Sequence, residues 1–441
     1  MNRLVSCGVL FFGLILCCHS AAAEEADCLS CHQQENSGLY QQWLNSAHGQ
    51  NDVGCIDCHG AAPGDPDGFE HHGSLVATLV TPQDCGVCHE KEAQEAMDSY
   101  HAHAGEILES GDAYLAHAVA GHPVVIVGCE ACHGARVKID PQAPNKLSSQ
   151  TWPNSGVGRI NPDGSKGSCN ACHSRHSFST YQARQPENCG KCHLGPDHPQ
   201  KEIYEASKHG IGYRGFRETL NMERDSWVVG VDYYNAPTCT TCHMSATPDL
   251  DITHDVGDRI SWTLRPPLAK AKNDAQKKRA AMQQVCLACH QQPFVDGHYY
   301  QYDAVVRLYN EKFARPATDI MVIIKNNGLL EQEASFANDI EWTYYELWHH
   351  QGRRARMGAA MMAPDYAWWH GMYEVAHTFY FEFLPQARSY GDQEVNNYID
   401  ALLADDPMHA WLSSNTEEIK NGIRSGKLQQ IYRRLFETVQ N

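Results

Sequence analysis

After residue 23 the chain has no cysteine outside one repeated motif and no long apolar segment, and the chain as a whole has no excess of positive charge. Every cysteine after residue 20 belongs to one five-residue pattern, so the cysteine chemistry of this part is the chemistry of that pattern. The later apolar runs, such as residues 123–127 and 320–324, fall short of the roughly 20 residues of a spanning helix. The formal net charge of −18 makes nucleic acid an implausible partner. We therefore expect a soluble chain with no membrane span.

The pattern is Cys-x-x-Cys-His, and it occurs eight times. In c-type haem attachment, two thiols add across the haem vinyl groups and the adjacent histidine binds the iron. Paired zinc sites or a disulfide framework need no histidine after the second cysteine, so the pattern predicts eight covalently bound c-type haems. The attachment residues are Cys28, Cys31, His32; Cys55, Cys58, His59; Cys85, Cys88, His89; Cys129, Cys132, His133; Cys169, Cys172, His173; Cys189, Cys192, His193; Cys239, Cys242, His243; and Cys286, Cys289, His290.

Residues 1–23 have the pattern of a secretory signal peptide. Arg3 supplies positive charge, residues 9–18 form a short apolar core, and three alanines at 21–23 provide a cleavage site. Covalent haem attachment takes place outside the cytoplasmic membrane, so the two features agree. The sequence predicts a periplasmic protein.

We expect a mainly α-helical fold in two regions, an octahaem-binding region at 24–300 and a helical region at 301–441. The motifs supply one haem per roughly 33 residues, too little chain for an apolar core around each haem, so the porphyrins should form the core. After about residue 291 helical periodicity takes over, and the apolar stripes should be core or helix–helix contacts. Pro316 should break the first helix, and Pro364 could open a later one. The stripes are Tyr302, Val306, Tyr309, Phe313; Ile340, Tyr344, Leu347; Trp368, Met372, Val375, Phe379; and Leu428, Ile431, Leu435.

Second axial ligands should come from histidines outside the motifs. A low-spin electron-transfer haem needs such a ligand, and a local Ser-x-His pattern recurs four times. Surface or propionate-bonding roles remain open for each candidate. The candidates are His48, His101, His176 and His209 in that pattern, with His71, His122 and His254 next. Seven distal ligands for eight irons would leave one iron open to substrate, which predicts an enzyme rather than a protein that only transfers electrons.

Four stretches carry a specific resemblance. Residues 167–176 (GSCNACHSRH), 189–199 (CGKCHLGPDHP), 348–356 (WHHQGRRAR) and 364–371 (PDYAWWHG) resemble the hydroxylamine oxidoreductase family of octahaem cytochromes. The motif count and the helical C-terminal third fit as well, so the resemblance covers essentially the whole mature chain.

The resemblance implies that the fourth haem, held by Cys129, Cys132 and His133, is catalytic. It also implies that Asp197 and His198 form a carboxylate–imidazole pair over its open face, which would accept substrate protons. An axial-ligand role for His198 and a turn role for Asp197 remain open alternatives.

Oxidative members of the family carry a tyrosine from a neighbouring subunit, cross-linked to the catalytic porphyrin within a homotrimer. Tyr366 is the best match, with Tyr373 and Tyr345 close enough to compete, and a packing role for Tyr366 is the alternative. Arg353, Arg354 and Arg356 would form a solvated basic face or pair with haem propionates.

Three functions follow in order of preference. The first is oxidation of hydroxylamine or hydrazine, with electrons leaving through bis-histidine haems to a small soluble cytochrome c or a quinone-linked partner. The second is reduction of nitrite or hydroxylamine at an ordinary catalytic haem. The third is a pure electron conduit in which all eight irons carry two protein ligands. The acidic surface would suit a basic cytochrome, although charge for solubility alone explains it equally well.

Overall fold

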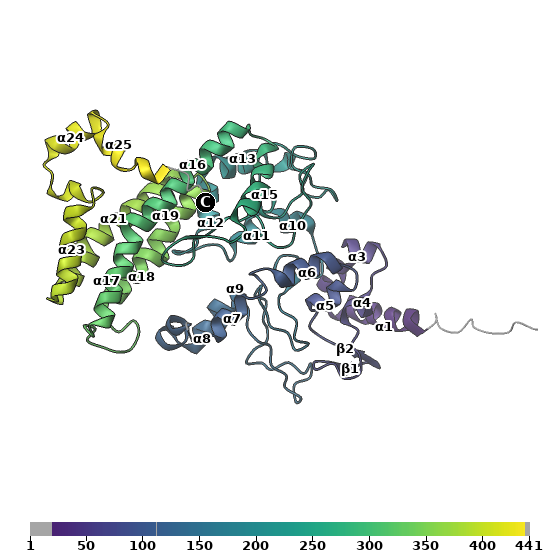
Figure 1. Cartoon of the computed structure of the whole chain (residues 1–441). Coiled ribbons are helices and arrows are strands. Elements are labelled where there is room, and N and C mark those ends of the chain that lie inside the picture. Colours follow the sequence, from purple (N-terminus) through teal and green to yellow (C-terminus); the bar gives the residue numbers. More distant parts are fainter. Residues whose placement is uncertain (1–19, 112, 437–441) are drawn as a thin grey trace, which may run out of the picture.

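A computed structural model describes residues 20–111 and 113–436, and almost every regular element in it is a helix (Figure 1). The mainly α-helical expectation is confirmed. Most of the predicted signal peptide, residues 1–19, lies outside the described residues. Elements labelled η are short 3₁₀ or π helices.

The N-terminal elements form a unit below and to the right of the remaining helices in Figure 1. Strands β1 (Phe69–His71) and β2 (Ser74–Val76) pair antiparallel, with Phe69 opposite Val76. The helices are α1 (Ser20–Glu35), α2 (Ser37–Leu44), α3 (Ala47–Gln50), α4 (Cys55–His59), α5 (Pro82–Gly86), α6 (Glu90–Asp98), α7 (Ala104–Glu109), η1 (Leu115–Gly121), α8 (His122–Val124), η2 (Val125–Cys129) and α9 (Glu130–His133).

The middle of the chain combines short helices with long connections. Strands β3 (Trp262–Thr263) and β4 (Lys270–Ala271) form a second antiparallel pair. The helices are η3 (Cys169–Ala171), α10 (Thr180–Arg184), α11 (Pro186–Gly190), α12 (Gln200–Ala206), α13 (Lys208–Phe216), η4 (Arg217–Thr219), α14 (Cys239–His243) and α15 (Ala275–Leu287).

The C-terminal third is a bundle of longer helices. Its elements are α16 (Gln292–Leu308), η5 (Tyr309–Ala314), α17 (Arg315–Asn326), α18 (Asp339–Tyr345), η6 (Glu346–Gln351), α19 (Gly352–Ala360), α20 (Pro364–Ala367), η7 (Trp368–Tyr373), α21 (Glu374–Thr378), η8 (Phe379–Phe383), α22 (Leu384–Ser389), α23 (Gln393–Asp405), η9 (Ala410–Ser413), α24 (Thr416–Arg424), α25 (Lys427–Ile431) and η10 (Arg433–Phe436). Helix α16 runs across the expected region boundary at residue 300.

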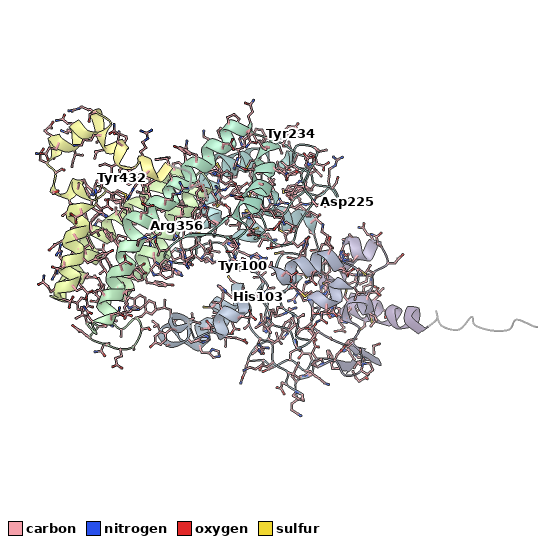
Figure 2. The ribbon with its side chains drawn as sticks, viewed as in Figure 1. Tyr100, His103, Asp225, Tyr234, Arg356 and Tyr432 are labelled. Carbon is pink, nitrogen blue, oxygen red and sulfur yellow. The ribbon has the colours of Figure 1, made fainter. Side chains whose placement is uncertain are left out.

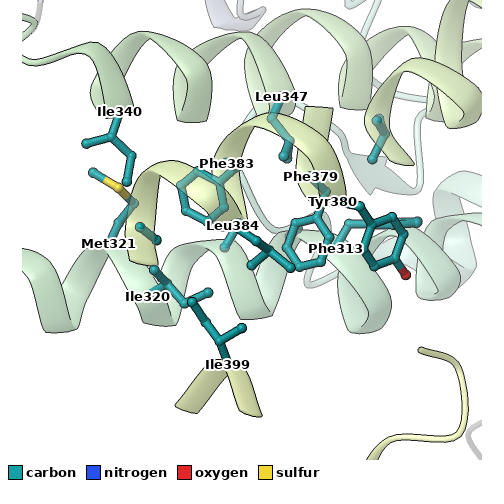
Figure 3. Packing of buried hydrophobic residues seen from close by; sticks show 14 of the residues in the cluster. Phe313, Ile320, Met321, Ile340, Leu347, Phe379, Tyr380, Phe383, Leu384 and Ile399 are labelled. Carbon is teal, nitrogen blue, oxygen red and sulfur yellow. The ribbon is translucent and has the colours of Figure 1, made fainter. Parts of the chain in front are cut away.

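Most of the predicted stripes meet in one apolar cluster of this bundle (Figure 3). Phe313, Ile340, Leu347 and Phe379 are all almost completely buried in it. Tyr302 and Val306 lie in a separate cluster with Ala269, and Leu435 lies in a third with Ala304 and Met408. The core role of these stripes is confirmed. Trp368 is an exception, because 51 % of it is exposed and it contacts Trp369 and Tyr373 instead. The π-helical η7 begins at Trp368, and its wider turn changes the face that each residue presents.

The expected break at Pro316 was wrong. Helix α16 continues through η5 into α17, and Pro316 lies in the first turn of α17. The π-helical turn of η5 just before the proline changes the hydrogen-bond spacing where the ring would clash with an ordinary α-helix. The backbone therefore passes the proline without ending the helix.

One helical segment is longer than the apolar runs considered in the sequence, although the part of the chain that the structure describes shows no clear membrane span. Residues Leu115–His133 form one helical segment of 19 residues that is long and apolar enough to cross a membrane by length and composition alone. Only 6 % of its most apolar window is buried, and Val127 is 77 % exposed. The segment also carries the fourth attachment motif in its last turns.

Candidate haem sites and acid–base centre

Five motif histidines each face one of the predicted axial histidines at a nearly constant distance. An iron bonded to one nitrogen of each ring at about 2 Å separates those nitrogens by about 4 Å, and half a ring on either side adds about 2 Å. The observed separations match this sum, so these residues fit a haem iron between them. The ring centroids are 6.2 Å apart for His32 and His71, 6.2 Å for His59 and His176, 6.1 Å for His89 and His48, 6.0 Å for His193 and His101, and 6.1 Å for His290 and His209.

Helix capping explains part of the recurring Ser-x-His pattern. Ser46 is the N-cap of α3 and accepts a hydrogen bond from the Gly49 backbone, so His48 lies in the first turn. Ser207 caps α13 in the same way, which puts His209 in its first turn. A capped first turn gives each ring a defined starting position without a long helix.

The other predicted axial histidines have different surroundings. The pKa of His173 is lowered to about 4, first by burial and then by the nearby His254. His254 is therefore close to the fifth motif histidine. The ring of His122 stacks on His117 at 5.8 Å, so the structure brings His122 to a histidine outside the motifs. His298 is half-buried and was not among the candidates from the sequence. It lies near His209, whose pKa is lowered by burial, then by His290 and then by His298. The only sequence signal for His298 was its place shortly after the last motif.

Contacts between attachment thiols show which motifs lie together. The thiol of Cys85 lies close enough to that of Cys169 to affect its pKa, and the same holds for Cys239 with Cys189 and for Cys132 with Cys192. The third motif is thus beside the fifth, and the sixth is beside both the fourth and the seventh. The fourth motif adjoins the sixth rather than following the chain order.

His133 differs from the paired motif histidines. In the part of the chain that the structure describes, no other histidine ring faces it at the separation of the five pairs. Burial lowers its pKa, and His198 and Arg265 lower it further, whereas Asp197 acts in the opposite direction. The structure therefore brings the predicted Asp197 and His198 into the surroundings of His133.

Asp197 is the centre of a charged cluster. Nδ1 of His198 lies 2.5 Å from its Oδ1, while Nη1 of Arg353 donates to its Oδ2 at 3.2 Å. Nε2 of His349 lies 3.9 Å from the same Oδ2. Burial would raise the pKa of Asp197, but the hydrogen bond and charge of His198, then His349 and Arg353, lower it to about 2. Asp197 is thus a carboxylate at any physiological pH.

Sequence reasoning missed the supporting role of the C-terminal bundle at this site. Arg353 also donates from Nε and Nη2 to the backbone oxygen of Arg265, at 3.0 and 2.7 Å. His349 and Arg353 lie in the quoted 348–356 stretch, so the signal was present, but nothing local connects them to Asp197.

The three arginines of that stretch do not form a solvated face. Arg353 binds Asp197, Arg354 pairs with Glu374, and Arg356 is fully buried over the ring of Tyr309 inside the bundle (Figure 2). Both terminal nitrogens of Arg356 lack a hydrogen-bond partner, which fits a buried site that receives an anionic group such as a propionate.

The three candidate tyrosines have distinct environments. Tyr366 is half-buried on α20, where its backbone packs closely against Gly358 and Gly371, and its ring contacts His370. Tyr373 belongs to the exposed aromatic group with Trp368 and Trp369. Tyr345 stacks on His349 at 4.2 Å.

Comparisons with known proteins agree on the kind of molecule. A family described as "Seven times multi-haem cytochrome CxxCH" matches residues 161–336. The "Probable nitrite reductase-hydroxylamine oxidoreductase fusion protein" of Kuenenia stuttgartiensis is 23 % identical, over 78 % of this chain and 49 % of that protein. The chain therefore spans about half the length of this curated relative.

Two solved structures share the fold. A "Hypothetical multiheme protein" has a TM-score of 0.73 with 24 % identity, covering 86 % of this chain and 96 % of the other. A chain of the "reducing HAO-like protein complex" of Kuenenia stuttgartiensis has a TM-score of 0.61 with 19 % identity, covering 86 % of each chain.

Proposed function

We propose that this multihaem c-type cytochrome, which resembles the hydroxylamine oxidoreductase family, is a periplasmic enzyme that oxidises hydroxylamine or hydrazine at its fourth haem. The observation that carries this proposal is the Asp197–His198 pair in the surroundings of His133, where five other motif histidines have a second imidazole instead. A haem with an open face supplies an iron that binds the substrate nitrogen and accepts its electrons. The chain's own residues then handle the protons.

In this proposal His198 accepts substrate protons and Asp197 stabilises the imidazolium that results. Their 2.5 Å contact leaves Nε2 of His198 as the nitrogen available to the substrate. Arg353, 14 % exposed, keeps Asp197 charged and in place. A carboxylate–imidazole pair of this kind contributes about 10²–10⁴-fold to a proton-transfer step.

Eight haems and a bis-histidine path complete the proposed enzyme. The five ring pairs support His71, His176, His48, His101 and His209 as distal ligands of haems 1, 2, 3, 6 and 8. We assign His254 to haem 5 because it lies near His173. We assign His298 to haem 7 because it lies near His209, the proposed ligand of haem 8, and because Cys242 of the seventh motif is close enough to Cys286 of the eighth to interact with it. The Cys132–Cys192 contact supports a route from haem 4 into the others through haem 6. His122 has no iron in this scheme.

The direction of catalysis depends on Tyr366. In the proposed homotrimer its phenol is cross-linked to haem 4 of a neighbouring subunit, which favours withdrawal of electrons from substrate. The exposed Trp368, Trp369 and Tyr373 beside it are an apolar surface suited to a subunit contact. Export through the signal peptide and delivery of electrons to a small, basic cytochrome belong to the same proposal.

A reductive nitrite or hydroxylamine reductase is the second candidate. It is favoured by the printed descriptions of the relatives, one a "nitrite reductase" fusion and the other a "reducing" complex. The cross-link separates the two candidates. A cross-linked chain runs as a covalent oligomer on a denaturing gel, and Tyr366→Phe should abolish that oligomer, keep all haems and shift activity towards reduction. A wild-type chain that runs as a monomer would favour the reductase.

Turnover assays with an artificial acceptor test the main proposal directly. We expect hydroxylamine or hydrazine oxidation by the wild type and a fall of about 10²–10⁴-fold in kcat for Asp197→Asn, with little change in the haem spectrum. Oxidation of neither substrate would overturn the oxidative proposal. A resting protein without any high-spin haem would instead indicate a pure electron conduit.

A further inference from the structure

The carboxylate of Asp197 is held on both of its oxygens. Oδ1 faces Nδ1 of His198 at 2.5 Å, and Oδ2 faces Nη1 of Arg353 at 3.2 Å and Nε2 of His349 at 3.9 Å. A carboxylate can turn about its terminal bond unless groups on both sides fix it. Here the two groups on Oδ2 come from η6 and α19, far along the chain from Asp197.

His349 is itself tightly positioned. Its ring stacks on Tyr345 at 4.2 Å with an interplanar angle of 19°, and Trp348 packs edge-on at 5.0 Å. Its side chain is only 18 % exposed, and its Nδ1 is buried without a hydrogen-bond partner. A neutral imidazole has one N–H, and since Nε2 faces the carboxylate, the N–H belongs there and Nδ1 is the bare nitrogen.

We propose that His349 is a positioning residue for the proposed reaction: it directs an N–H dipole at Oδ2 of Asp197, so that Oδ1 stays on His198 and Nε2 of His198 stays available to the substrate. This inference rests on the proposed role of Asp197 and His198. The 3.9 Å separation is too long for a direct hydrogen bond, so the contact acts through the field of the N–H or through one bridging water.

Arg353 alone does not fix the orientation of the Asp197 carboxylate. Its Nε and Nη2 are committed to the backbone oxygen of Arg265, which leaves Nη1 for Asp197. With one donor on each oxygen, Oδ2 is restrained from the direction of Arg353 only. His349 approaches the same oxygen from a stacked, rigid ring and adds a second restraint.

The test replaces His349 with phenylalanine, which keeps the stack on Tyr345 and removes both nitrogens. Two rates are measured in the holoprotein: turnover, and association of hydrogen cyanide, which must give its proton to a nearby base before cyanide binds an open iron. We expect both rates to fall on the order of 10-fold in His349→Phe, with KM little changed, as for other residues that orient a ligand's partner. His377→Phe is the matched control, because His377 pairs with Glu382 on the surface, and it should leave both rates unchanged.

A double-mutant cycle with Asp197→Asn separates positioning from general damage. If His349 acts through Asp197, adding His349→Phe to Asp197→Asn should cause no further loss in the cyanide association rate. An independent, multiplied loss, or a single variant that matches the wild type, would overturn the inference. Cyanide effects without turnover of any substrate would retain the inference and reject the proposed function.

Discussion

The first half of the haem-binding part and the C-terminal bundle bury their side chains in opposite ways, whereas residues 204–285 have an apolar cluster of their own. Around residues 79–147 the apolar cluster has only Leu79, Val137 and Leu147 as buried members. The bundle instead joins residues from η5 to α23 into one cluster that includes Phe313, Ile324 and Phe379. A region with so few apolar contacts of its own must obtain its core from the haems, whereas the bundle supplies its own.

Removal of haem should give the largest effect on this contrast. A chain produced without haem attachment should lose the fold of residues 28–147 while the helices after Gln292 persist, because the bundle has a continuous apolar core and residues 79–147 have only three buried members in theirs. Limited proteolysis with mass spectrometry would show protected fragments from the C-terminal third. Equal digestion of both parts would contradict the comparison.

The second-largest effect should come from a cavity created in the apolar cluster of the bundle. Phe379→Ala removes a ring that is fully buried among Phe313, Tyr380 and Phe383, and should lower the free energy of unfolding of the bundle by about 3–5 kcal/mol. Chemical denaturation followed by far-ultraviolet circular dichroism measures this. Phe381→Ala is the control, since Phe381 is 60 % exposed and its loss should change stability by less than about 0.5 kcal/mol. Equal effects would mean that the bundle is not packed as described.

A buried histidine gives the bundle a pH dependence of its own. Burial lowers the pKa of His409 to about 4, and its Nδ1 shares a 2.8 Å hydrogen bond with Tyr380. Since the unfolded histidine titrates near 6.5, its contribution is complete above that pH and is lost as the pH falls towards 4, by up to about 3 kcal/mol. Unfolding midpoints between pH 4 and 7 should fall less steeply in His409→Gln. An unchanged slope would exclude His409 as the cause.

The smallest effect should come from the bundle surface. Arg388→Ala removes a 2.6 Å ion pair with Asp400, whose side chain is 66 % exposed, so the free energy of unfolding should fall by less than about 1 kcal/mol. Denaturation at low and high salt measures it, and the difference from wild type should shrink at high salt. A loss comparable to that of Phe379→Ala would show that surface charge, rather than the apolar cluster, stabilises the bundle.

The features that can be predicted from this sequence are those with a local signal. Each attachment motif is five consecutive residues, and the Ser-x-His pattern reflects a cap and a ring within one turn, as at Ser46 and His48. The stripe through Tyr309 and Phe313 follows one helix, so its burial was also predictable. The helical class and the resemblance to the hydroxylamine oxidoreductase family are confirmed on the same basis.

The remainder depends on contacts or backbone changes that no short window contains. The continuation past Pro316 required the π turn of η5, and the exposure of Trp368 coincides with the π turn of η7. The support of Asp197 by Arg353 joins residues 156 positions apart. Such a contact exists only after the chain has folded over that distance, and no sequence pattern announces it.

The ion pair between Asp197 and Arg353 also implies an order of events during synthesis, in which the haem-attachment motifs are made before the residue that supports Asp197. The last of the eight attachment motifs ends at His290, so a chain made only as far as residue 300 already contains every motif. Arg353 and His349 arrive later, and until they do the carboxylate beside His133 lacks its second support. A truncated or half-made chain would be red and redox-active yet deficient in proton handling. In the proposed enzyme, the proton-transfer step would thus be delayed until the last third of the polypeptide had docked.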